Sequence, residues 1–66
     1  MHEQPGNGAR FGVVNLIDEA KREAFMRRRV YPKQVSAGRM SQEEADRRID
    51  LMEAIVSRLT RTAQVE

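Results

Sequence analysis

The sequence lacks cysteine and tryptophan and has a single histidine, His2, among its 66 residues. Without cysteine the chain has no disulfide framework and no thiolate metal site, and one histidine cannot supply the ligand spacing of a zinc centre. There is also no glycine-rich phosphate-binding loop and no recognisable set of catalytic side chains. These absences predict that the protein is not an enzyme and that it holds no metal and no cofactor.

Long apolar segments are missing as well. No apolar run approaches the roughly 18 residues that a membrane-spanning helix needs, and residues 1–12 contain no apolar segment typical of a signal peptide. A chain of this length buries only about 60% of the surface that its unfolded form exposes, so a single thin core is the most that it can build. We therefore expect one soluble, cytoplasmic domain without a membrane partner.

Residues that interrupt regular structure gather in residues 1–12, which hold three of the four glycines and one of the two prolines. The few apolar side chains here cannot offset the entropy lost on ordering, so this segment is predicted to be a disordered tail. From Val13 onward a stripe of positions recurs alternately four and three residues apart, which is the spacing of one helix face in a coiled coil. The stripe consists of Val13, Ile17, Ala20, Ala24, Arg27 and Tyr31.

Pro32 sets the predicted end of this first helix, because a proline disfavours helical geometry at the residue before it, Tyr31. The helix is therefore expected over residues 13–30, with Gly12 or Asn15 near its start. Residues 31–41 are predicted to form a structured bend in which Gly38 ends one short helical turn.

The second helix has the clearest start signal in the chain. Ser41 is followed three residues later by Glu44, which is the spacing of a capping box. The helix is therefore predicted to begin at Gln42 and to run to Ala63, leaving residues 64–66 frayed. Its stripe consists of Ala45, Ile49, Met52, Val56, Leu59 and Ala63.

The two stripes match when the helices are laid antiparallel. Tyr31 then lies opposite Ala45 and Val13 lies opposite Ala63. The stripe positions between these two pairs also lie opposite one another in register. Small side chains on the first helix face larger ones on the second, which permits close approach. The predicted fold is all-α: a coiled-coil-like antiparallel two-helix hairpin with a structured bend, which Val35 and Met40 are available to plug.

A lone hairpin leaves one side of each stripe uncovered and cannot enclose a core. The chain also carries apolar side chains outside or at the edge of the seam between the two stripes, where a second copy would cover them. We therefore expect a homodimer arranged as a four-helix bundle with two-fold symmetry. The candidate residues of the dimer interface are Leu16, Phe25, Met26, Leu51 and Ile55.

Basic residues cluster around the predicted bend, although the formal net charge of the chain is only +2. Arginine binds carboxylates and phosphates bidentately, so this cluster is able to hold an anionic partner. The alternative is a solvated helix end paired with Asp46, Asp50 or Glu53, and we favour it because successive residues point 100° apart on a helix. The candidate partner-binding residues are Arg28, Arg29, Tyr31, Lys33 and Arg39.

The residues of the basic run are expected to differ in role. Arg27 lies on the seam, so its stem should pack and its head should emerge near the acidic residues of the second helix. Arg28 and Arg29 are expected to point progressively away from those acidic residues. Tyr31 is either a binding anchor or, as we favour from its seam position, a ring that closes the end of the hairpin.

The segment from Arg27 to Ile55 resembles a group of small uncharacterised proteins from phages, prophages and proteobacterial chromosomes. They share the pattern RRxVYPxxVxxGxxxxxEAxxxIxxMxAI, and the matching positions here are Arg27, Arg28, Val30, Tyr31, Pro32, Val35, Gly38, Glu44, Ala45, Ile49, Met52, Ala54 and Ile55. The resemblance implies no activity and no functional residue. A phage-type origin would favour a small accessory factor that binds another protein.

The sequence thus predicts a small non-enzymatic interaction module that binds either a protein partner or a second copy of itself. The alternative is a small nucleic-acid-binding protein that uses the basic bend from Arg27 to Arg39. Nucleic-acid binders usually add exposed aromatic side chains or a known reading motif. This chain has only two phenylalanines and one tyrosine, and no helix-turn-helix spacing, so the alternative ranks second.

Overall fold

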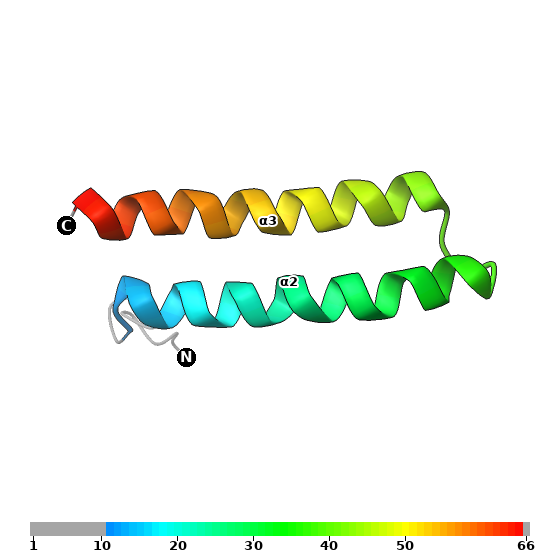
Figure 1. The fold of residues 1–66 in the computed structure, drawn as a ribbon, viewed down its shortest axis with the longest axis horizontal. Helices are drawn as coiled ribbons and strands as arrows, with labels where there is room; N and C mark the ends of the chain where they lie inside the picture. The colour runs from blue at the N-terminus through cyan, green and yellow to red at the C-terminus, as the bar shows by residue number, and fades with distance from the viewer. Residues whose placement is uncertain (1–10, 66) are drawn as a thin grey trace, which may run out of the picture.

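The computed structural model describes residues 11–65, which form two long helices joined by a short bend (Figure 1). Helix α2 spans Val13–Ser36 and helix α3 spans Gln42–Val65, and each contains 24 residues. The helices lie side by side and antiparallel, so the start of α2 and the end of α3 share one end of the hairpin. The described part of the chain is therefore all-helical, and the predicted two-helix hairpin is confirmed.

The start of α2 is held by Asn15 from inside the helix. Gly12 precedes the helix in an extended conformation, and its N–H donates to Asn15 Oδ1 at 3.1 Å. The Gly12 carbonyl in turn accepts hydrogen bonds from the N–H groups of Asn15 and Leu16. Of the predicted disordered tail only Phe11 and Gly12 belong to the described residues, and Gly12 is the cap of α2; residues 1–10 lie outside them.

The predicted end of the first helix at Val30 is wrong, because α2 continues through Pro32 to Ser36. The prediction relied on the steric restriction that Pro32 places on Tyr31, and Pro32 in addition lacks the N–H that would bond one turn back. Tyr31 and Val35 are half-buried on the side of α2 that meets α3. Packing of these side chains outweighs the local preference, as tertiary contacts often do. The bend consequently shrinks from residues 31–41 to residues 37–41.

Gly38 ends α2 itself, whereas the sequence predicts that it ends a separate short turn within the bend. Its φ of +76° lies in the left-handed region, which a residue without a Cβ adopts at little cost. The Gly38 N–H donates to the Val35 carbonyl at 3.0 Å and the Arg39 N–H donates to the Gln34 carbonyl at 2.9 Å. This pair of bonds is the Schellman motif, which satisfies carbonyl groups left without partners at a helix end.

Helix α3 begins at Gln42, which confirms the predicted start. Ser41 Oγ accepts a hydrogen bond from the Glu44 N–H at 3.0 Å, as an N-cap serine does. The Glu44 carboxylate does not turn back to the cap and instead accepts from Arg48 Nε at 3.0 Å, so half of the capping box forms. At its other end α3 runs on to Val65, two residues beyond the predicted stop, while Glu66 lies outside the described residues.

The core is a narrow seam between the two helices. Every position of the two predicted stripes is buried or half-buried, which confirms the seam. Ala20, Ala24 and Met52 form its centre, with Val56 and Leu59 packed against them. Most of the buried residues are alanines, so the helices approach closely but bury little apolar area. The buried residues are Ile17, Ala20, Ala24, Ala45 and Met52.

The cap at Ser41 offers a direct test of the α3 start. Ser41→Ala leaves the Glu44 N–H without its acceptor and should lower the free energy of unfolding by about 1 kcal/mol. Ser57→Ala is the matched control, because Ser57 is exposed within α3 and no hydrogen bond among the described residues involves its side chain. Urea denaturation measures both variants. Equal midpoints would mean that α3 starts elsewhere.

Candidate functional site

The seam divides the surface of the hairpin into two faces with different chemistry. Each helix turns by 100° per residue, so residues on either side of the seam positions fall on opposite faces. An ion pair between Arg28 and Glu53 marks one face, which we call the Arg28 face. A hydrogen bond from Arg27 to the Arg48 carbonyl marks the other, which we call the Leu51 face after the apolar residue at its centre.

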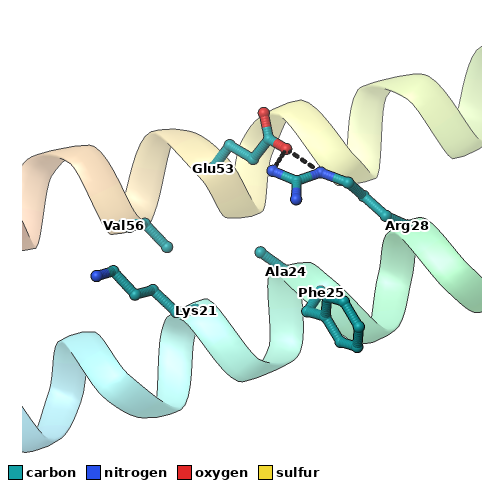
Figure 2. A pocket seen from close by; sticks show the side chains of 6 residues that line it. All are labelled: Lys21, Ala24, Phe25, Arg28, Glu53 and Val56. Carbon is teal, nitrogen blue, oxygen red and sulfur yellow. Dashed lines mark hydrogen bonds and ion pairs between the residues drawn. The ribbon is translucent and has the colours of Figure 1, made fainter.

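On the Arg28 face, an arginine from α2 reaches across to a carboxylate of α3. Arg28 Nε donates to Glu53 Oε2 at 2.6 Å, and Arg28 Nη2 donates to the same oxygen (Figure 2). The expectation that Arg28 points away from acidic residues is therefore wrong. Glu53 follows Met52 directly, and this single step of rotation carries its carboxylate to the side of the seam on which Arg28 lies.

An open hollow of about 440 Å³ adjoins this ion pair. Ala24 and Val56 lie between the two helices there, whereas the Phe25 ring turns away from α3 (Figure 2). The Arg29 guanidinium carbon lies 5.6 Å from the centre of the Phe25 ring, a cation–π contact within one helix. Half of the lining residues are charged and half are apolar, so the hollow combines both kinds of surface. The lining residues are Lys21, Ala24, Phe25, Arg28, Glu53 and Val56.

Arg27 joins the helices on the Leu51 face. Its Nε donates to Glu23 Oε2 at 2.9 Å in the same helix, and its Nη1 donates to the Arg48 carbonyl of α3 at 2.9 Å. The side chain is only 24% exposed, so the predicted packing of its stem holds. The Arg27 head, which was expected to emerge near the acidic residues of α3, forms no ion pair with them within the described residues. Its acidic partner lies one turn earlier in α2, and α3 supplies a backbone oxygen instead.

Exposed apolar side chains cluster on the Leu51 face. Leu16 and Met26 of α2, with Leu51 and Ile55 of α3, are between 40% and 47% exposed. Phe25 is exposed as well, but it lines the hollow beside Arg28 and Glu53. The structure therefore brings four of the five candidate dimer residues to one face and places the fifth on the other.

The candidate partner-binding residues separate into two groups. Arg28 is occupied by Glu53, and Tyr31 is half-buried with the Arg27 guanidinium carbon 6.0 Å from the centre of its ring. Lys33 and Arg39 are exposed, and neither forms an ion pair within the described residues; the same is true of Arg29, which rests on Phe25. Three cations near the bend thus remain without an acidic partner in this part of the chain.

Residues 11–65 show neither a candidate metal site nor a candidate membrane-spanning helix. This range contains no group of three or more acidic, histidine or cysteine side chains placed to hold a metal ion. His2 lies outside it. Neither helix combines the length and apolar character needed to cross a bilayer.

Comparisons with family models, with curated proteins and with solved structures found no match. The resemblance of the segment from Arg27 to Ile55 to small phage and proteobacterial proteins therefore stays a prediction.

The two neighbouring arginines should differ in their contribution to stability. Arg27→Ala removes hydrogen bonds of a half-buried guanidinium and should lower the free energy of unfolding by about 1–2 kcal/mol. Arg28→Ala breaks a surface pair whose side chains are 54% and 38% exposed, and should cost at most about 1 kcal/mol. Urea midpoints measure both.

Arg22→Ala serves as the control for this comparison. Its contact with Glu19 is 3.7 Å long and both side chains are 74% exposed, so the midpoint should not move. If Arg28→Ala lowered the free energy of unfolding more than Arg27→Ala does, the prediction that Arg27 contributes more to the stability of the hairpin would be wrong.

Proposed function

We propose that the protein is a small non-enzymatic interaction module that associates with a second copy of itself, forming a four-helix bundle. The observation that carries this proposal is the Leu51 face, where Leu16, Met26, Leu51 and Ile55 leave an apolar surface open beside a seam whose buried residues are mostly alanine. Covering this surface would supply the apolar burial that the thin seam lacks.

The choice of face follows from its chemistry. A two-fold dimer uses the same surface of both copies, so that surface must be compatible with itself. The Arg28 face presents an ion pair and Lys21 around its hollow, and their burial would carry a desolvation cost. The Leu51 face carries ion pairs as well, Arg27 with Glu23 and Arg48 with Glu44, but it also holds four exposed apolar side chains and is therefore the better contact surface. A different protein partner with an apolar helix face would compete for the same residues.

Light scattering on a sizing column tests self-association. We expect a mass of twice 7.6 kDa at high micromolar concentration. Leu51→Asp together with Ile55→Asp should shift the protein toward the monomer, because two buried carboxylates would lack partners. Phe25→Ser is the matched control on the opposite face and should leave the dimer intact. Circular dichroism checks that each variant remains helical.

Two outcomes would contradict the proposal. A parent protein that stays monomeric and fully helical at high concentration needs no second copy. Loss of the dimer in Phe25→Ser but not in the double aspartate variant would move the interface to the Arg28 face.

The alternative function, nucleic-acid binding through the bend, has one supporting observation. Arg29, Lys33 and Arg39 carry no acidic partner within the described residues, and phosphate contacts need such available cations. Two ion pairs argue against it, because Arg27 already pairs with Glu23 and Arg28 with Glu53. The basic run therefore offers fewer phosphate contacts than its sequence suggests.

Fluorescence anisotropy with a labelled 20-base-pair duplex tests this alternative. Binding through the bend should fall steeply with salt, and Arg29→Glu together with Lys33→Glu should weaken it while leaving the helices formed. Lys21→Glu together with Arg61→Glu makes the same change in net charge away from the bend, and should have a smaller effect. Equal losses in the two double variants would show a response to net charge alone.

A further inference from the structure

The side of α2 that points away from α3 is basic and carries one exposed aromatic ring. Its residues recur three or four positions apart, so they lie on one side of the helix. We call this side the outer stripe; it consists of Arg22, Phe25, Arg29 and Lys33. We propose that the outer stripe binds single-stranded nucleic acid, with phosphate groups on its three cations and an unpaired base against Phe25. The proposal gives the nucleic-acid alternative a defined ligand class, and it rests on that alternative and not on self-association.

The position of each cation relative to the seam explains its exposure. Each cation follows a seam residue by two positions, which is about 200° of rotation on a helix, and therefore points away from α3. All three side chains are exposed. Phe25 follows the seam residue Ala24 by one position, and its ring also turns away from α3 (Figure 2). The whole stripe is therefore open to solvent. The seam residues and the cations that follow them are Ala20 and Arg22, Arg27 and Arg29, and Tyr31 and Lys33.

Few carboxylates compete for these cations. Between Lys21 and Ser36 the only acidic residue is Glu23, which accepts from Arg27 Nε at 2.9 Å. The acidic residues of α3 lie beyond the seam, on the side of α2 opposite to the stripe. Arg29 and Lys33 form no ion pair within residues 11–65.

Arg22 is nearly as available as the other two cations. Its contact with Glu19 is 3.7 Å long, and both side chains are 74% exposed. Such a surface pair contributes little to stability, so a phosphate displaces it at small cost. Arginine in addition binds phosphate bidentately, and two of the three cations are arginines.

Phe25 distinguishes this surface from an ordinary solvated helix side. The residue is 54% exposed, and the Arg29 guanidinium carbon lies 5.6 Å from the centre of its ring. This contact holds a charged hydrogen-bond donor beside an open aromatic ring. Proteins that bind single strands combine a basic track along the backbone with aromatic side chains on which bases stack. The structure thus supplies the exposed aromatic side chain that a basic run by itself lacks.

The ring also selects among polyanions. In a duplex the bases are stacked on one another inside the helix, so a phenylalanine on a protein surface reaches only an unpaired base. An acidic protein segment would pair with the three cations through its carboxylates, and those contacts would not use the ring. The exposed position of Phe25 beside Arg29 therefore favours a single strand.

Fluorescence anisotropy with a labelled oligothymidine of about 20 nucleotides tests the charge contacts, because such a strand exceeds the site size of a typical single-strand binding fold. The parent should bind this strand more tightly than a duplex of equal length. Three phosphate contacts at about 0.7 each predict a slope of about −2 for log affinity against log salt. Arg29→Gln together with Lys33→Gln should reduce the magnitude of this slope by about 1.4.

Arg47→Gln together with Arg61→Gln is the matched control for the charge contacts. Both arginines are exposed on α3, and neither forms an ion pair within residues 11–65. The control removes the same net charge away from the outer stripe and should change the slope less. Equal changes in the two double variants would overturn the assignment of the phosphates to the stripe.

Substitutions of Phe25 test the stacking contact separately. Phe25→Ala should raise the dissociation constant for oligothymidine by about 5- to 150-fold and leave the salt slope unchanged, because stacking releases no counterions. Phe25→Tyr keeps an aromatic ring and should bind as the parent does. Circular dichroism checks that both variants remain helical.

Three results would overturn the proposal. They are a parent protein that does not bind oligothymidine at low salt, a duplex bound as tightly as the single strand, and a Phe25→Ala variant with an unchanged dissociation constant. Polyglutamate that competes as well as unlabelled oligothymidine would assign the stripe to an acidic protein partner and would overturn it as well. Self-association is measured independently by light scattering, so its failure is distinguishable from each of these results.

Discussion

The close packing of small side chains along one seam is the constraint on which the rest of this structure depends. Ala20, Ala24 and Ala45 bring the two helices near each other, and Met52 fills the space between them. Alanine permits this approach at no side-chain entropy cost, but it removes little apolar area from water. The register of the hairpin is therefore well specified, but its core buries little apolar area. This imbalance makes its uncovered apolar surface the principal candidate for function.

The seam also determines how the charged residues are used. Arg27 and Arg28 are neighbours in sequence, yet 100° of rotation sends them to opposite faces, where each reaches across to α3. Two arginines of the basic run, which by itself would suggest anion binding, therefore already form contacts between the two helices. Four exposed apolar side chains share the Leu51 face, while half of the residues that line the hollow on the Arg28 face are charged. The two faces consequently present different chemistry to a partner.

Most of the architecture was predictable from the sequence, because its signals are local. Alternating spacings of three and four residues specify one buried side of a helix whatever that side contacts, and every seam position is buried or half-buried as expected. The Ser41 hydroxyl and the left-handed Gly38 act within one turn of the residues that they cap, so their effects do not depend on distant contacts. The exposed character of Leu16, Met26, Leu51 and Ile55 follows from the same periodicity.

Only the tertiary structure decided the remaining features, since each depends on a contact with the other helix. The penalty that Pro32 imposes on helical geometry is local. Helix α2 nevertheless extends past it, and the half-burial of Tyr31 and Val35 there depends on contact with α3. Glu53 accepts from Arg28 only because rotation about α3 carries it to the same side of the seam. The separation of Phe25 from Leu16, Met26, Leu51 and Ile55 has the same origin. Periodicity identifies the side of a helix that is buried, whereas the pairing of two helices determines which of their outer residues share a face.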